Sequence, residues 1–215
     1  MKVEIWSDVV CPFCYIGKRK FEAALKQFEA KEQVEIEWKS FQLNPQTITD
    51  PNITTYENLA NHKGIPEEQA RLMANQVTDM AKTVGLDFDF EKAVVANTFR
   101  AHRLLHFSKN QGKQDQLKER LLTAYFSNGE NIDDVRTLTK IASEVGLDEA
   151  EVREFLYSDE LALEVKADIQ EAQALSIHGV PFFVFDRKYG VSGAQDTMVF
   201  VDTLRKTLHE SEKDH

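Results

Sequence analysis

The chain has 215 residues, which is the length of one domain or of one domain with a large insertion. Its 26 lysine and arginine residues are outnumbered by 36 aspartate and glutamate residues, which gives a formal net charge of −10. This charge argues against binding to the phosphate backbone of a nucleic acid and against binding to an anionic membrane surface. No apolar run approaches the roughly 20 residues of a membrane-spanning helix.

The first residues do not have the pattern of a secretion signal. Glu4 and Asp8 interrupt the apolar run that such a signal needs. We therefore expect a cytoplasmic protein, and in that compartment free thiols stay reduced.

The pattern of the first forty residues predicts a β-α-β unit. Residues 2–10 alternate and then turn apolar, which predicts a strand. Apolar residues recur at helical spacing over 21–28, so a helix should follow, with Cys11 at its N-cap and Pro12 at its first position. Alternation over 34–38 predicts a second strand.

The middle of the chain has the pattern of a helical block. Residues 44–52 are predicted to be a loop, because Pro45 and Pro51 break regular structure. Caps and apolar spacing then predict successive helices with no strand between them. They are expected over 65–84, 90–110, 113–127, 133–145, a segment capped by Asp148, and a segment that follows Ser158 and ends near residue 176.

The last part of the chain returns to strands. Residues 181–185 and 189–192 are predicted to pair through a short turn, and a final helix is expected over 198–208. Strands therefore bracket the helical block. We predict an α/β fold in which residues 1–44 and 177–215 form one discontinuous domain and residues 45–176 form a helical insertion.

Both cysteines of the chain lie in a single C-x-x-C between a predicted strand and a predicted helix. The start of a helix stabilises a thiolate, so we expect Cys11 to be the attacking nucleophile. Cys14, one turn further on, would then resolve the mixed disulfide. Two other interpretations are a structural cysteine pair and half of a zinc site, for which His102 and His106 are the only paired histidines. We expect no metal.

Pro181 stands at the head of a predicted strand, in the segment 179–183. Proline is tolerated at a strand start, so the position needs no further explanation. Alternatively, the Val180–Pro181 bond is cis and turns the backbone of Val180 toward a substrate.

Several motifs together resemble the DsbA-type thioredoxin-fold proteins, specifically their FrnE-like branch. The matching segments are Trp6-Ser7-Asp8 with Cys-Pro-Phe-Cys-Tyr-Ile-Gly-Lys, Asn97-Thr98 through Leu104, Ala124-Tyr125-Phe126, Gly179 to Val184, and Val191 to Gln195. The resemblance implies an α/β thioredoxin fold interrupted by a large all-helical insertion. It also implies that Val180-Pro181 is a cis-proline loop facing the C-x-x-C.

The same family tree includes 2-hydroxychromene-2-carboxylate isomerases and kappa-class glutathione transferases, which typically carry a serine where this chain has Cys11. We therefore predict a thiol–disulfide oxidoreductase that acts on protein or low-molecular-weight thiols and disulfides and needs no organic cofactor. Glutathione as co-substrate, and a monomeric or homodimeric state, are left open. The alternatives are a glutathione-dependent isomerase or transferase acting on a small aromatic or polyketide-like molecule, and a non-catalytic binding module.

Further residues are candidates for substrate contact. Trp6 and Phe13 either form an apolar rim for a substrate or are ordinary core and surface aromatics. Pro12 and Val180 are further candidates for substrate contact. The resemblance implies that Gly193, Ala194 and Gln195 line a groove, although a strand-to-helix turn explains them equally well. His102 is expected on a solvated helix face rather than against a substrate.

Overall fold

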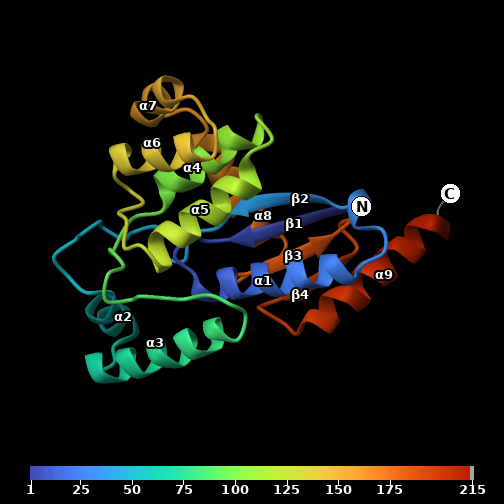
Figure 1. The fold of residues 1–215 in the computed structure, drawn as a ribbon, viewed down its shortest axis with the longest axis horizontal. Coiled ribbons are helices and arrows are strands. Elements are labelled where there is room, and N and C mark those ends of the chain that lie inside the picture. Colours follow the sequence, from blue (N-terminus) through green and yellow to red (C-terminus); the bar gives the residue numbers. More distant parts are fainter. Residues whose placement is uncertain (214–215) are drawn as a thin grey trace.

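A four-stranded mixed sheet organises the chain (Figure 1). A computed structural model describes residues 1–213 and contains β1 (Lys2–Ser7), β2 (Glu35–Ser40), β3 (Phe182–Phe185) and β4 (Tyr189–Ser192) in the order β2-β1-β3-β4. β1 pairs parallel with β2 and antiparallel with β3, and β3 pairs antiparallel with β4. The central strand β1 therefore joins the two ends of the chain in one sheet.

Helices make up most of the remaining described residues. They are α1 (Pro12–Gln27), a short 3₁₀ helix (Lys31–Gln33), α2 (Thr55–Lys63), α3 (Glu67–Lys82), α4 (Phe99–Lys109), α5 (Gln114–Phe126), α6 (Val135–Glu144), α7 (Glu149–Tyr157), α8 (Ala162–Ala174) and α9 (Thr197–Lys213). In the part of the chain that the structure describes, no helix is long and apolar enough to cross a bilayer.

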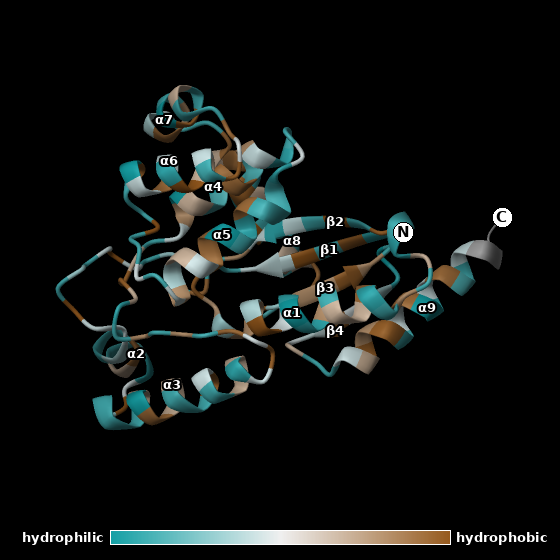
Figure 2. Ribbon diagram, in the orientation of Figure 1, coloured by the Kyte–Doolittle hydropathy of each residue, from teal (hydrophilic) through white to brown (hydrophobic). Residues whose placement is uncertain are grey.

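Each face of the sheet is covered by helices. On one face, α1 and α9 enclose the rings of Phe21, Phe183 and Phe200, whose centroids lie 4.6–5.7 Å apart. On the other face, α8 places Ala172 against the buried ring of Trp6. Figure 2 shows the hydrophobic residues gathered along β1 and β3, where both layers meet. This burial supplies the main driving force for forming the sheet.

The predicted α/β architecture with an interrupting, mostly helical segment is confirmed. The strands come from the two ends of the chain, and α2 to α8 lie between β2 and β3 in the sequence. The exact domain boundaries, 1–44 with 177–215 and 45–176, remain a prediction. Residues 214–215, at the end of the range 177–215, lie outside the described part of the chain.

Helix α4 is fastened to the sheet by two histidine–aspartate pairs. His102 Nε2 donates to Asp8 at the end of β1, at 3.0 Å. One turn later, His106 Nε2 lies 2.9 Å from Asp168 of α8, whose carboxylate also accepts the Ser40 amide of β2. The two histidines that a zinc interpretation would need are therefore each paired with a carboxylate.

The structure differs from the predicted elements at three places. The helix expected over 90–110 begins only at Phe99, because residues 90–98 form a turn and an irregular segment, and the Phe88 ring packs 4.5 Å from the Phe126 ring between centroids. No element was expected between residues 52 and 65, yet α2 forms there, capped by the Thr54 hydroxyl. The first strand ends at Ser7 rather than at residue 10, because the chain turns at Asp8.

Gly17 of α1 provides a test of how closely the helix must approach the Pro181 loop. Alanine normally stabilises a helix interior relative to glycine, by roughly 0.5–1 kcal/mol. Here a Cβ would lie 2.9 Å from Cγ of Pro181 and 3.6 Å from Cα of Ala194. We therefore expect Gly17→Ala to lower the free energy of unfolding, by about 1–3 kcal/mol, in a urea titration. A gain in stability would show that the loop yields to the added methyl group.

Candidate active site

The two cysteines lie where the sequence predicts them, at the start of α1. Cys11 is the N-cap and Pro12 is the first helical residue. The Cys14 amide donates to the Cys11 carbonyl at 3.0 Å, and both thiols are free. Cys11 is 3% exposed and Cys14 1%, but only Cys11 is among the residues that line the neighbouring cavity. A substrate entering that cavity therefore meets Cys11 first.

The loop before β3 closes over Cys11. The Val180–Pro181 peptide bond is cis. The Cys11 thiol donates to the Val180 carbonyl, with 3.5 Å between Sγ and oxygen. The Gly193 amide, at a left-handed φ of 82°, donates to the Pro181 carbonyl at 2.8 Å and so ties this loop to the end of β4. Gly193 thus positions the loop rather than contacting the cavity.

The buried carboxylate of Asp8 lies three residues before Cys11. It accepts hydrogen bonds from the Val9 amide at 2.8 Å, from the Leu43 amide at 2.8 Å and from His102 Nε2 at 3.0 Å. Burial alone would raise the pKa of Asp8, but the bonds from His102 and Leu43 outweigh it and hold the pKa below its ordinary value. Asp8 is therefore ionised at neutral pH although it is 1% exposed.

His102 is neutral in this arrangement. It is fully buried, contrary to the expectation of a solvated helix face, because α4 turns this residue toward β1. Burial lowers the pKa of His102 despite the nearby Asp8. Since Nε2 carries the hydrogen donated to Asp8, Nδ1 is an unprotonated acceptor, and it has no hydrogen-bond partner.

Lys118 of α5 is a buried cation beside the thiols. Its side chain is 1% exposed, and its Nζ has no hydrogen-bond partner. Nζ lies 5.3 Å from the ring centroid of Trp38, within cation–π range. Burial lowers the pKa of Lys118 to about 8, while the charges of Cys14 and Asp8 work in the opposite direction. Burying an ammonium without a hydrogen-bond partner costs free energy. Because no hydrogen bond compensates its charge, the Lys118 ammonium can stabilise a nearby anion.

The two thiols lose their protons in separate steps, because each sulfur influences the other. The hydrogen bond to Cys14 and burial raise the pKa of Cys11 well above its ordinary value. Burial also opposes ionisation of Cys14, but its bond to Cys11 and the charge of Lys118 bring its pKa below the ordinary value. The helix start is therefore not the only influence on the Cys11 thiol, because burial and the neighbouring Cys14 both oppose its ionisation. Cys11 is buried and donates to Val180, whereas the cation acts on Cys14.

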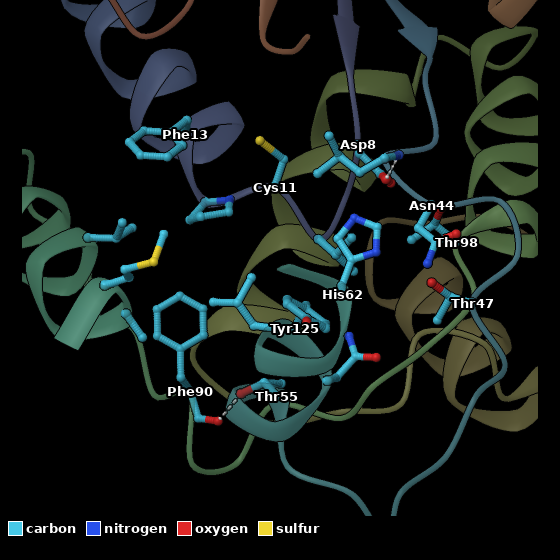
Figure 3. A pocket seen from close by; sticks show the side chains of 18 of the residues that line it. Asp8, Cys11, Phe13, Asn44, Thr47, Thr55, His62, Phe90, Thr98 and Tyr125 are labelled. Atoms are coloured by element: carbon cyan, nitrogen blue, oxygen red, sulfur yellow. Dashed lines mark hydrogen bonds between the residues drawn. The ribbon is translucent and has the colours of Figure 1, made fainter. Parts of the chain in front are cut away.

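A cavity of about 420 Å³ opens beside Cys11 (Figure 3). Pro12, Phe13 and Val180 line it, as expected from the sequence. Asp8 and Tyr125 line it as well, and His62 and Phe90 point into the space below Cys11. The C-x-x-C loop, the loop after β2 and the α2–α3 pair thus share one concave site.

Trp6 does not contact this cavity. Its ring is fully buried beneath α8, and its Nε1 donates to the Asp168 carbonyl at 3.0 Å. The prediction that Trp6 binds substrate is therefore wrong, because β1 turns this residue to the opposite face of the sheet. Ala194 and Gln195 also lie outside the cavity lining, and the Ala194 carbonyl accepts a hydrogen bond from Lys20.

Sequence reasoning missed four residues of the site. Asp8 stands three residues before Cys11, but nothing local indicates that its carboxylate is buried. Lys118 follows Leu117 in α5 and has the sequence context of a surface lysine. His62 and Lys63 lie at the end of α2, which the pattern Thr54-x-x-Glu57 could have revealed as an N-terminal capping signature.

Comparison with known proteins shows the family. Residues 2–205 match the model of the DSBA-like thioredoxin domain. This chain belongs to the DsbA-like thioredoxin family. It is 32% identical over 187 residues to the Bacillus subtilis uncharacterized protein YwbO, with 85% of each chain covered. It is 38% identical to a probable DsbA oxidoreductase from Streptomyces coelicolor, whose crystal structure superimposes with a TM-score of 0.91 over 98% of this chain and 91% of that one.

More distant structures share the fold alone. The cytosolic disulfide reductase DsbM from Pseudomonas aeruginosa, solved with glutathione, has a TM-score of 0.67 at 15% identity over 97% of this chain and 100% of that one. A 2-hydroxychromene-2-carboxylate isomerase has a TM-score of 0.67 at 14% identity over 100% of this chain and 98% of that one. One thioredoxin-like scaffold therefore accommodates both redox chemistry and isomerisation.

The role of Lys118 can be tested with Lys118→Met, which keeps the length of the side chain and removes its charge. Without the cation, the more acidic thiol of the pair loses its stabilising partner, so its pKa should rise. Thiolate absorbance in the ultraviolet, followed against pH in the reduced protein, measures this change.

Lys18→Met is the matched control, because Lys18 is equally buried but is ion-paired with Glu22 and Glu119. It should leave the thiol titration unchanged. Lys118→Met should also raise the free energy of unfolding at pH 7, by roughly 1–3 kcal/mol. The buried ammonium lowers the free energy of unfolding by its full amount below about pH 8, the pKa of Lys118 in the folded protein. This destabilisation fades as the pH rises and is absent above pH 10.5, the pKa of Lys118 in the unfolded chain. An unshifted titration in Lys118→Met would remove Lys118 from the account.

Proposed function

We propose that this protein is a thiol–disulfide oxidoreductase in which Cys11 attacks and Cys14 resolves. The observation that carries this proposal is the placement of two free thiols at the start of α1, with only Cys11 facing the cavity. Membership of the DsbA-like family supports it, as does the likeness to the probable oxidoreductase from Streptomyces coelicolor.

The reaction follows from the geometry in two steps. Cys14, when ionised beside Lys118, accepts the proton of the neighbouring Cys11 thiol. The Cys11 thiolate then attacks one sulfur of a substrate disulfide, and the first substrate thiol leaves. Cys14, after losing its proton again beside Lys118, attacks Cys11 Sγ and releases the second thiol. The enzyme dithiol is oxidised, and the substrate disulfide is reduced; the reverse sequence forms a substrate disulfide.

The cofactor and compartment follow from the same chemistry. The two cysteines carry the electrons, so the reaction as proposed requires no organic cofactor. Glutathione is the co-substrate that we propose, since a disulfide reductase of the same fold was solved with it. We also propose a cytoplasmic setting, in which a reducing thiol pool would return the pair to the dithiol.

A glutathione-dependent isomerase or transferase is the second candidate function. The isomerase fold and a cavity suited to a small molecule favour it. In that reaction Cys11 would orient the thiol of glutathione, and no step would use Cys14. The two functions therefore differ in whether Cys14 is required.

Single-cysteine variants separate these mechanisms. Cys14→Ser should accumulate a mixed disulfide on Cys11 when the protein is incubated with glutathione disulfide, because the resolving step is lost. Intact-protein mass spectrometry should show one added glutathione per chain. Cys11→Ser is the control and should show little adduct, since Cys14 does not line the cavity. Equal trapping in both variants, or turnover retained in Cys14→Ser, would contradict the assigned roles.

A further inference from the structure

The cavity beside Cys11 has the dimensions of a small-molecule site. Its volume of about 420 Å³ falls within the range of about 300–1,000 Å³ that is typical of pockets for small ligands. Helices α2 and α3 lie across from the C-x-x-C and enclose it (Figures 1 and 3). An extended polypeptide would instead need an open groove along the Val180 loop.

Most of the wall is apolar. Leu59 comes from α2, and Ala74 and Val77 come from α3. Phe90 and Tyr125 supply aromatic rings on the side below Cys11 (Figure 3). Such a wall favours a ligand with an apolar group about the size of an aromatic ring, because burying that group releases its hydration water.

The lining contains an exposed cation, the side chain of Lys63. His62 and Lys63, in the last turn of α2, both line the cavity and are exposed. Among the described residues, Lys63 has no ion-pair partner. Asp8 is the carboxylate of the described lining, and three hydrogen bonds already satisfy it. The Asp8 carboxylate is 1% exposed, whereas the Lys63 side chain is exposed, so Lys63 is the charged group that a ligand in the cavity can reach. That charge complements an anionic ligand group.

We infer that the substrate is a small disulfide or mixed disulfide that joins an apolar, ring-sized group to a carboxylate. This inference rests on the proposed function. Cys11 attacks the disulfide sulfur that carries the apolar group and forms a mixed disulfide with it, and the other sulfur leaves as a thiol. Cys14 then displaces the second thiol, forming the Cys11–Cys14 disulfide, so that the enzyme loses two electrons and the substrate gains them.

A polypeptide substrate is the competing interpretation. Phe13 is 41% exposed and Leu43 47% exposed at the edge of the site, and an unfolded chain could lie on them. That substrate would use the surface of the rim rather than the interior of the cavity. Filling the interior should therefore affect the two substrate classes differently.

The test uses the fully reduced protein and three disulfides. Dithiobis(nitrobenzoate) carries an aromatic ring and a carboxylate on each sulfur, and dithiodipyridine carries a ring without a carboxylate. Single-turnover release of their coloured thiols is followed by stopped flow over a range of concentrations. Insulin reduction in the presence of dithiothreitol measures exchange with a polypeptide.

The variants are chosen in matched pairs. Ala74→Phe and Val77→Phe fill the cavity, and Leu72→Phe, on an exposed position of α3 outside the lining, is their control. Lys63→Gln removes the cavity charge. Its control is Lys26→Gln, at an exposed lysine in the last turn of α1.

We expect the two filling variants to slow both aromatic disulfides by about tenfold or more, while insulin reduction stays within about twofold. Lys63→Gln should slow dithiobis(nitrobenzoate) by roughly two- to fivefold and leave dithiodipyridine unchanged. Both control variants should behave as the wild type. If the phenylalanine variants do not fold, Leu59→Ala, which enlarges the cavity, should raise the half-saturating concentration of both aromatic probes.

Two results would overturn the inference. One is an unchanged rate with both aromatic disulfides in the cavity variants. The other is a loss of insulin reduction as large as the loss with the aromatic probes, which would place a polypeptide in the site. A wild-type protein that exchanges none of the three disulfides faster than a free thiol would instead refute the proposed function itself.

Discussion

The buried carboxylate of Asp8 is the interaction on which the site depends. Its two oxygens hold the amide of Val9 before the C-x-x-C, the amide of Leu43 after β2, and the imidazole of His102 on α4. These groups come from three segments that are distant in sequence. Because an unpaired buried carboxylate is costly, the three donors have to assemble together. The sheet, the thiol loop and the helical insertion are thereby fixed relative to one another.

That carboxylate also shapes the electrostatics of the thiols. Asp8 opposes ionisation of Cys11, whereas Lys118, from a different helix of the insertion, favours ionisation of Cys14. The insertion thus supplies both the cation that tunes the cysteine pair and, through α2 and α3, the wall of the cavity in front of it. Reactivity and substrate choice would therefore both depend on helices outside the β-α-β unit that carries the cysteines.

Features that depend on the local sequence pattern could be predicted from the sequence. The C-x-x-C at a strand–helix junction, with Pro12 at the first helical position, follows from spacing and capping alone. The burial of Trp6 on the far face, and of His102 against β1, depends on tertiary packing that no local pattern contains. The irregular segment before Phe99 is similar: Asp89 does cap a turn, but aromatic packing of Phe88 overrides the helix.

The central claim is that Cys11 and Cys14 form a reversible intramolecular redox pair. The most direct test equilibrates the protein in buffers of varied glutathione to glutathione-disulfide ratio, traps the free thiols by alkylation and determines their number by mass spectrometry. The account predicts a single transition between a species with two alkylated thiols and one with a Cys11–Cys14 disulfide, approached equally from either side. Thiols that stay reduced at every ratio, or a stable glutathione adduct in place of the internal disulfide, would contradict it.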